Sequence, residues 1–365
     1  MDTIIRCGQC GRQAEALAWR CVACGGVLDL HTDARFDPAS IVQDDFSLWR
    51  YQHIFPVRKQ RSLGEGMTPI AEADFDGKVI LKLDYLNPTG SYKDRGTATM
   101  MNHMAAQGVR EVVEDSSGNA GASVAAYASM FGIRSRIFVP AQGVSAKKAL
   151  IRAFGGELVE VEGDQQAKTD ACEIAAQTTP YASHAWSPYF IMGQTSAGYE
   201  LWEQLGRRVP DAIIVPTGHG MLLLGIARAF RKLYDAKLIQ DMPRMIAVQS
   251  EKSAPIVRGY ELRSEAPPVV ESERTIADGI IVKYPIRGRE VLTTLRQTGG
   301  IAVRVDEQQI ADAQRACWQG GFMCEATSAV TIAALPQVRA HLNNPSALIV
   351  CALTGNALKT VGLQA

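Results

Sequence analysis

One lysine of this chain lies in a turn whose composition suits a reactive amine. The segment Asn87 to Gly96 reads NPTGSYKDRG, so Lys93 follows Pro, Thr, Gly and Ser residues and precedes a stretch rich in methionine and alanine. A single lysine is normally a solvated surface charge. In this turn, however, the neighbours favour a buried amine that can lose its proton and form a Schiff base with a carbonyl group. We therefore predict covalent chemistry at Lys93.

A second turn is suited to binding a carboxylate. Residues 116–123 read SSGNAGAS, between the apolar segment EVVED and an alanine-rich stretch. Free backbone N–H groups at a helix start bind anions, and the carboxylate of a small substrate fits there. The alternative is an ordinary helix N-cap whose small residues serve close packing.

A third turn has the composition of a phosphate site. Residues 216–221 read PTGHGM, after the segment AIIVP and before LLLGIARAF. Such a turn can surround a phosphate with main-chain donors and the positive end of a helix dipole, without any basic side chain. Because glycine-rich turns after strands are common, this motif is weak when taken alone.

All three turns fall where a predicted strand is followed by a predicted helix. From residue 78 the two patterns alternate, which is typical of a parallel sheet flanked by helices. Such sheets bind ligands at the carboxyl ends of their strands. The predicted strands are residues 78–86, 111–115, 135–140, 157–163, 212–216, 244–250 and 347–355, and the predicted helices are 97–108, 122–132, 147–155 and 222–235. Residues 262–275 are polar and proline-bearing, so we expect a surface loop there.

The first thirty residues contain two CxxC pairs, each followed directly by glycine. Four thiolates at the corners of a tetrahedron suit zinc, and so short a segment has no core of its own to fold it. A redox dithiol pair and a rubredoxin-like iron site are the alternatives. The predicted ligands of a structural zinc ion are Cys7, Cys10, Cys21 and Cys24. We interpret the other four cysteines as small buried hydrophobic residues.

Composition limits the kinds of partner. The chain has 365 residues, and its 38 lysine and arginine residues balance 38 aspartate and glutamate residues. This balance speaks against a polyanion such as nucleic acid, or an anionic membrane, as the main partner. The N-terminus lacks the pattern of a secretion signal, and no stretch of about 18 apolar residues occurs. We expect a cytoplasmic protein that acts on small molecules.

Together the three turns resemble the fold-type II enzymes that use pyridoxal 5'-phosphate (PLP), and most closely the threonine synthase branch. Further matching segments are GEGMTPI, GQTSAGYE, TIADGI, EATSA and LTGNALK, in the same order. The resemblance implies that Lys93 holds PLP covalently and that Thr354 faces the pyridine nitrogen. It implies that Asn119 contacts the phenolic oxygen of the cofactor. It implies a phosphate site at Gly218, His219, Gly220, Met221 and Leu222. It implies substrate contacts at Ser116, Ser117, Gly118, Asn119, Ala120, Ser123 and Lys147.

The same resemblance implies an α/β fold with two open twisted parallel-sheet domains and an N-terminal zinc-ribbon-like segment. We place that segment at residues 1–30, a large PLP-binding domain at 31–76 and 191–365, and a small α/β domain at 77–190. A homodimer is the usual state of the family.

The expected reaction is elimination or replacement on an amino acid. A neutral hydroxyl at Thr354 leaves the cofactor ring less electron-withdrawing than a carboxylate would, which favours elimination over transamination. We place threonine synthase first, with O-phosphohomoserine and water as substrates.

Several residues depart from the threonine synthase pattern. The segment 183–190 reads SHAWSPYF where asparagines and an arginine are common, and Ala120, His219 and Met221 replace residues usual in that branch. Hence a β-lyase or β-replacement synthase acting on serine, threonine, phosphoserine or diaminopropionate stays open. A non-catalytic zinc-ribbon binding protein is the remote alternative.

Overall fold

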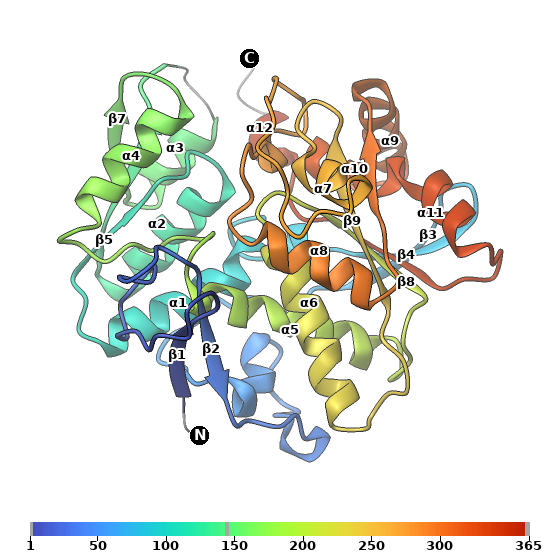
Figure 1. Ribbon diagram of the computed structural model, residues 1–365, viewed down its shortest axis with the longest axis horizontal. Helices are drawn as coiled ribbons and strands as arrows, with labels where there is room; N and C mark the ends of the chain where they lie inside the picture. The colour runs from blue at the N-terminus through green and yellow to red at the C-terminus, as the bar shows by residue number, and fades with distance from the viewer. Residues whose placement is uncertain (1–2, 143–145, 362–365) are drawn as a thin grey trace. The chain divides into compact units, whose positions relative to one another are not determined.

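Strands and helices alternate along most of the computed structural model, which describes residues 3–142 and 146–361. Two compact units account for the chain, and Figure 1 shows their elements. Unit 1 comprises Met1–Gly66, Asn87–Gly193 and Lys359–Ala365, whereas unit 2 comprises Met67–Leu86 and Gln194–Leu358. The predicted α/β class is confirmed.

Unit 1 is built on a three-stranded parallel sheet in the order β5-β6-β7. Helices connect successive strands, as parallel pairing requires. The elements are α1 (Lys93–Ala106), β5 (Glu111–Glu114), α2 (Asn119–Phe131), β6 (Arg134–Pro140), α3 (Ala146–Ala153), β7 (Glu157–Val161) and α4 (Gln165–Ala175). Helix α5 (Pro188–Gln204) begins in unit 1 and ends in unit 2.

Unit 2 is built on a six-stranded sheet in the order β10-β9-β8-β11-β4-β3. Its strands are β3 (Ile70–Asp74), β4 (Lys78–Lys82), β8 (Ala212–Pro216), β9 (Arg244–Ser250), β10 (Ala302–Val305) and β11 (Ile349–Ala352). Its helices are α6 (Met221–Asp235), α7 (Pro255–Glu261), α8 (Gly288–Gln297), α9 (Glu307–Gln319), α10 (Ala326–Ala333) and α11 (Leu335–Leu342). Helix α12 (Leu358–Val361) begins at the last residue of unit 2 and continues in unit 1. Strand β3 pairs antiparallel with β4, so this edge departs from an all-parallel sheet.

The core of unit 2 lies against both faces of its sheet. Alternate strand residues such as Leu81 and Ile214 pack with residues of α9, α10 and α11, for example Val330 and Val338. Side chains alternate across a strand, and intervening residues such as Ile213 are also fully buried. This explains why the strands read as continuous apolar runs in the sequence.

The compact units differ from the predicted domain boundaries mainly at residues 31–66 and 77–86, and also at residues 191–193 and 359–365. Residues 31–66 belong to unit 1, where the buried Glu65 accepts hydrogen bonds from Trp49 Nε1 and the Tyr127 hydroxyl, both at 2.8 Å. Strand β4 belongs to unit 2, because it pairs with β11 and β3. The two main differences arise from pairings between residues far apart in the chain.

The N-terminal segment forms an antiparallel pair from β1 (Thr3–Cys7) and β2 (Leu28–Thr32) within unit 1. Trp19 packs edge-on against Tyr181 and Trp186, with both ring centroids 5.3 Å away. The segment therefore shares an apolar cluster with the rest of unit 1. Among the described residues, no helix is long and apolar enough to cross a membrane.

Candidate active site

Lys93 is the first residue of α1 and is half-buried. Its Nζ donates to the Tyr92 hydroxyl at 2.8 Å and lies 6.0 Å from the centroid of the Phe190 ring. The helix predicted at residues 97–108 begins four residues earlier than expected, so Lys93 lies at the helix start. Gly96 allows this arrangement, because a Cβ there would lie 2.6 Å from Phe190.

The turn before Lys93 is held by a buried carboxylate. Asp94 accepts hydrogen bonds from the Thr89 backbone N–H at 2.7 Å, the Thr89 hydroxyl at 2.6 Å and the Ser123 hydroxyl at 2.6 Å. Burial raises the pKa of Asp94 to about 6, although these donors oppose the shift. Ser123 is fully buried, so its hydroxyl links α2 to the Lys93 turn.

The second turn leads directly from β5 into α2. Gly118 is the N-cap of α2, and it has no side chain with which to cap that helix end. The first backbone N–H groups of a helix lack intrahelical partners, and they favour an anion. Ser116, Ser117, Gly118 and Asn119 are all half-buried at this helix start, whereas Ala120 is buried. The loop can therefore bind a carboxylate without a basic side chain.

Two glycines of this loop offer a matched test of its close packing. A Cβ on Gly121 would lie 1.9 Å from the Ser116 carbonyl oxygen, whereas a Cβ on Gly118 would meet nothing closer than 3.8 Å among the described residues. We predict that Gly121→Ala lowers the free energy of unfolding by about 3 kcal/mol, because the backbone must shift. Gly118→Ala should cost about 1 kcal/mol or less. Urea unfolding of both variants measures the difference, and equal stabilities would show that the loop is loosely packed.

The two adjacent lysines at the start of α3 have different surroundings. Lys148 is buried, and its Nζ donates to the Pro140 carbonyl oxygen at 2.5 Å. Lys147 is half-buried, and its Cδ would lie 4.0 Å from a Cβ on Gly118. Of the two, Lys147 is the cation that lies beside the carboxylate-binding loop.

A third lysine contacts both turns of unit 1. Lys359 Nζ donates to Asn119 Oδ1 at 2.6 Å and to the Gly90 carbonyl oxygen at 2.8 Å. Asn119 is the first residue of α2, and Gly90 belongs to the Lys93 turn. The predictions from sequence assigned no role to Lys359.

The same unit contains a buried acid that the sequence analysis missed. Glu114, the last residue of β5, is fully buried, and its Oε1 lies 2.7 Å from His184 Nδ1. Its Oε2 has no hydrogen-bond partner among the described residues. Burial, followed by the nearby Asp115 carboxylate, raises the pKa of Glu114 well above its ordinary range. In the sequence, the segment EVVED at residues 111–115 has the pattern of a strand and gives no sign of a buried acid. Only the structure shows that Glu114 is buried.

In unit 2, the glycine-rich turn follows β8 and forms the N-terminus of α6. Gly220 is the N-cap with φ +92°, so the cap residue has no side chain to donate or accept. A Cβ on Gly220 would lie 2.3 Å from Val291 Cγ2, so glycine is required there. Met221 and Leu222 supply the first backbone N–H groups of the helix, which suit a phosphate. His219 Nδ1 accepts from the Ile286 backbone N–H at 3.3 Å, beside the half-buried Gly218.

Thr354 follows β11, the parallel neighbour of β8, at the same edge of the sheet. The Ser328 hydroxyl oxygen accepts from the backbone N–H groups of Thr354 and Gly355 at 2.9 and 3.0 Å. With both lone pairs used, Ser328 must donate its own proton, and Thr354 Oγ1 lies 3.2 Å away. Ser328 can also donate to the Gly355 carbonyl oxygen at 3.4 Å. With either acceptor, the Thr354 hydroxyl keeps its own proton to donate elsewhere.

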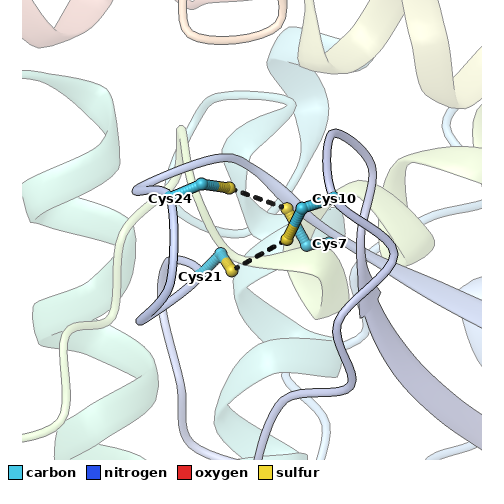
Figure 2. A group of neighbouring side chains, drawn as sticks. All are labelled: Cys7, Cys10, Cys21 and Cys24. Carbon is cyan, nitrogen blue, oxygen red and sulfur yellow. Dashed lines mark hydrogen bonds between the residues drawn. The ribbon is translucent and has the colours of Figure 1, made fainter.

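The four cysteine thiols of the N-terminal segment converge, as Figure 2 shows. The Cys7 and Cys24 sulfurs are 3.5 Å apart, those of Cys10 and Cys21 are 3.6 Å apart, and all four lie within 4.8 Å of one another. Zinc–sulfur bonds of about 2.3 Å in a tetrahedron imply sulfur–sulfur distances of about 3.8 Å. Backbone N–H groups of Ala23 and Cys24 lower the pKa of the Cys21 thiol to about 6. The Gly26 backbone N–H also acts to lower the pKa of Cys24, but the neighbouring Cys7 and Cys10 thiols raise it to about 12.

The sequence matches the model of one protein family and is similar to several threonine synthases. Residues 61–355 match the family described as pyridoxal-phosphate dependent enzyme. A threonine synthase of Methanosarcina acetivorans is 28% identical over 97% of this chain and 92% of that protein. A threonine synthase of Synechocystis sp. is 30% identical over 85% of this chain and 82% of that protein.

Solved structures agree on the fold. The structure of a T.th. threonine deaminase has a TM-score of 0.68 at 26% identity, and the match covers 79% of this chain and 92% of that one. Maize serine racemase also has a TM-score of 0.68, at 24% identity, and the match covers 79% of this chain and 89% of that one.

Proposed function

Because this chain belongs to the pyridoxal-phosphate-dependent enzyme family, we propose that it is a threonine synthase, which converts O-phosphohomoserine and water to threonine and phosphate. The observation that carries the proposal is the place of Lys147. This half-buried cation lies beside the loop that begins α2, so one loop region offers donors for a carboxylate and a charge for a phosphate. The near full-length similarity to threonine synthases supports the same substrate.

The residues of each unit fit the cofactor that the family uses. In unit 1, the residues expected to contact PLP are Lys93 and Asn119. In unit 2, they are Gly218, His219, Gly220, Met221, Leu222 and Thr354. The start of α6 suits the phosphate group, because Gly220 has no side chain that would cover the first backbone N–H groups of the helix. When bound, PLP supplies a sink for the electrons left when the Cα–H bond of the substrate breaks.

The chain itself supplies binding and proton transfer. The backbone N–H groups at the start of α2, together with Ser116 and Ser117, would bind the substrate carboxylate. Lys93 Nζ, when not bound to the cofactor, would be the base that removes the Cα proton. Lys147 would bind the phosphate group before it leaves. All these groups lie within unit 1, at the starts of three of its helices.

A second candidate reaction is β-elimination or β-replacement on serine, threonine, phosphoserine or diaminopropionate. The buried pair of Glu114 and His184 favours it for serine and threonine, because their hydroxyl leaving group needs a proton, whereas the phosphate of phosphoserine or O-phosphohomoserine leaves as an anion. Glu114 ends β5, at the base of the loop that would bind the carboxylate.

The deciding experiment offers the purified protein O-phosphohomoserine and measures the release of phosphate and the formation of threonine. We expect both products in equal amounts from a yellow protein. Consumption of serine, phosphoserine or diaminopropionate without turnover of O-phosphohomoserine would replace threonine synthase by the second candidate. A colourless protein that binds no PLP would instead support the remote alternative, a non-catalytic zinc-ribbon binding protein.

Lys147 gives a sharper test of the phosphate site. We predict that Lys147→Ala raises the KM for O-phosphohomoserine by about tenfold to a hundredfold, since hydrogen bonds to charged groups contribute about 1.5–3 kcal/mol. Arg152→Ala is the matched control on the same helix, because that exposed arginine pairs with Glu160 at 3.5 Å. The control should change KM by no more than about twofold. Equal effects of the two variants would place the phosphate elsewhere.

We also propose that the four-cysteine site holds one structural zinc ion. Metal analysis of anaerobically purified protein should find about one zinc per chain, and the double variant Cys7→Ser, Cys21→Ser should lose it together with thermal stability. Cys172→Ala, at a buried cysteine outside this site, should keep the metal. Protein that is fully folded without zinc, or that carries iron instead, would refute the assignment.

A further inference from the structure

We propose that Lys359 is a positioning residue that sets the orientation of the Asn119 amide and thereby strengthens its hydrogen bond to the cofactor. This inference rests on the proposed use of PLP. Lys359 lies in the segment LTGNALK near the end of the described chain, and it belongs to the same compact unit as Asn119 and Lys93. Lys359 is distant in the sequence from both turns of unit 1 that we expect to bind the cofactor or the substrate. Its side chain nevertheless contacts both of them.

The orientation of the amide follows from the kind of donor beside it. A lysine ammonium carries three protons and no acceptor, so the Asn119 atom 2.6 Å from Lys359 Nζ must be the oxygen Oδ1. The other end of the same amide is then the donor, the Nδ2 amino group. An asparagine held in this way presents N–H groups, and not an acceptor, on the side opposite the ammonium.

A second contact fixes the ammonium itself. Lys359 Nζ also donates to the Gly90 carbonyl oxygen at 2.8 Å. Gly90 lies three residues before Lys93 and has φ +77°, a conformation that favours glycine. Lys359 therefore bridges the Lys93 turn and the first residue of α2, which fixes the two turns relative to each other within unit 1.

The chemical consequence concerns the phenolic oxygen of PLP, which Asn119 is expected to contact. The positive charge of the Lys359 ammonium, beside the amide oxygen, draws electron density from the Asn119 amide. The N–H groups of that amide therefore become stronger donors toward an anionic oxygen. Lys359 is half-buried, so water screens this effect less than it would for a surface lysine. Without Lys359, the amide could turn over and present its oxygen to the phenolate, which repels it.

The test titrates PLP into the apoprotein of the wild type and of Lys359→Met, and records the visible spectrum of each complex. We expect the dissociation constant of PLP to rise about tenfold in Lys359→Met, with part of the yellow band moved to shorter wavelength. Lys359→Arg, which keeps charge and donors, should restore most of both properties. Lys283→Met, at an exposed lysine, is the matched control and should behave like the wild type.

A double-variant cycle separates positioning from general stability. If Lys359 acts through Asn119, then Lys359→Met should change the affinity for PLP by less than about twofold when Asn119 is already alanine. A full tenfold effect in the Asn119→Ala background would overturn the inference, as would a wild-type spectrum and affinity in Lys359→Met alone. A wild-type protein that binds no PLP would refute the proposed function as well. If the wild type is yellow and Lys359→Met has the same PLP affinity and spectrum, only the positioning role is refuted.

Discussion

Lys93→Ala should give a colourless protein that turns over no amino acid, with a loss of activity of at least about a thousandfold. No other lysine is expected to replace Lys93, because Lys82 and Lys359, which lie in or beside the site motifs, already donate hydrogen bonds to acceptors of the protein. Lys82 Nζ donates to three acceptors, and Lys359 Nζ donates to Gly90 and Asn119. Lys93 Nζ instead donates to the neighbouring Tyr92 hydroxyl, which is a neutral group.

Borohydride reduction of the wild type followed by peptide mapping locates the amine directly. The pyridoxyl group should be found on the peptide that contains Lys93. Lys283→Ala, at an exposed position, should keep the colour and the adduct. An adduct on Lys82 or Lys359 would show that the active amine lies elsewhere, and one on Lys359 would also contradict its positioning role.

The local features of this site could be predicted from the sequence, because each depends on a few adjacent residues. The turns around Lys93, Asn119 and Gly220 combine glycines and hydroxyl side chains with a strand before them and a helix after them, and the structure has those elements. The CxxC spacing likewise brings four thiols together, because each pair forms its own tight turn closed by Gly11 or Gly25 with positive φ.

Contacts between distant residues could not be predicted in the same way. Lys359 meets Asn119 across 240 positions, and His184 meets Glu114 across 70. Neither pair has a local pattern, because the distance in space depends on how helices and strands pack. The domain boundaries differed for the same reason, since Glu65 is placed by Trp49 and Tyr127 and not by its neighbours in sequence.

Lys82→Met should cause a large loss of stability, about 3–5 kcal/mol in the free energy of unfolding. Lys82 ends β4 inside unit 2, and its ammonium donates to the Thr68 carbonyl oxygen at 2.7 Å, Glu200 Oε2 at 2.8 Å and Gln204 Oε1 at 2.9 Å. The Lys82 side chain is 2% exposed and that of Glu200 is fully buried. Removing the cation leaves a carboxylate buried without its charge partner.

Two further variants test whether the buried charge is the cause. Lys82→Met combined with Glu200→Leu should recover most of the lost stability, because an apolar pair of similar volume replaces an uncompensated charge. Arg134→Met breaks an exposed pair with Glu157 at 2.6 Å and should cost no more than about 1 kcal/mol. Urea unfolding of the four proteins, including the wild type, measures these differences. If the double variant were as unstable as Lys82→Met, the loss would come from packing at β4 and not from the Glu200 charge left by the loss of the Lys82–Glu200 ion pair. In either case, Glu200 would support, through Lys82 of β4, the sheet that carries Thr354 and the turn at Gly220.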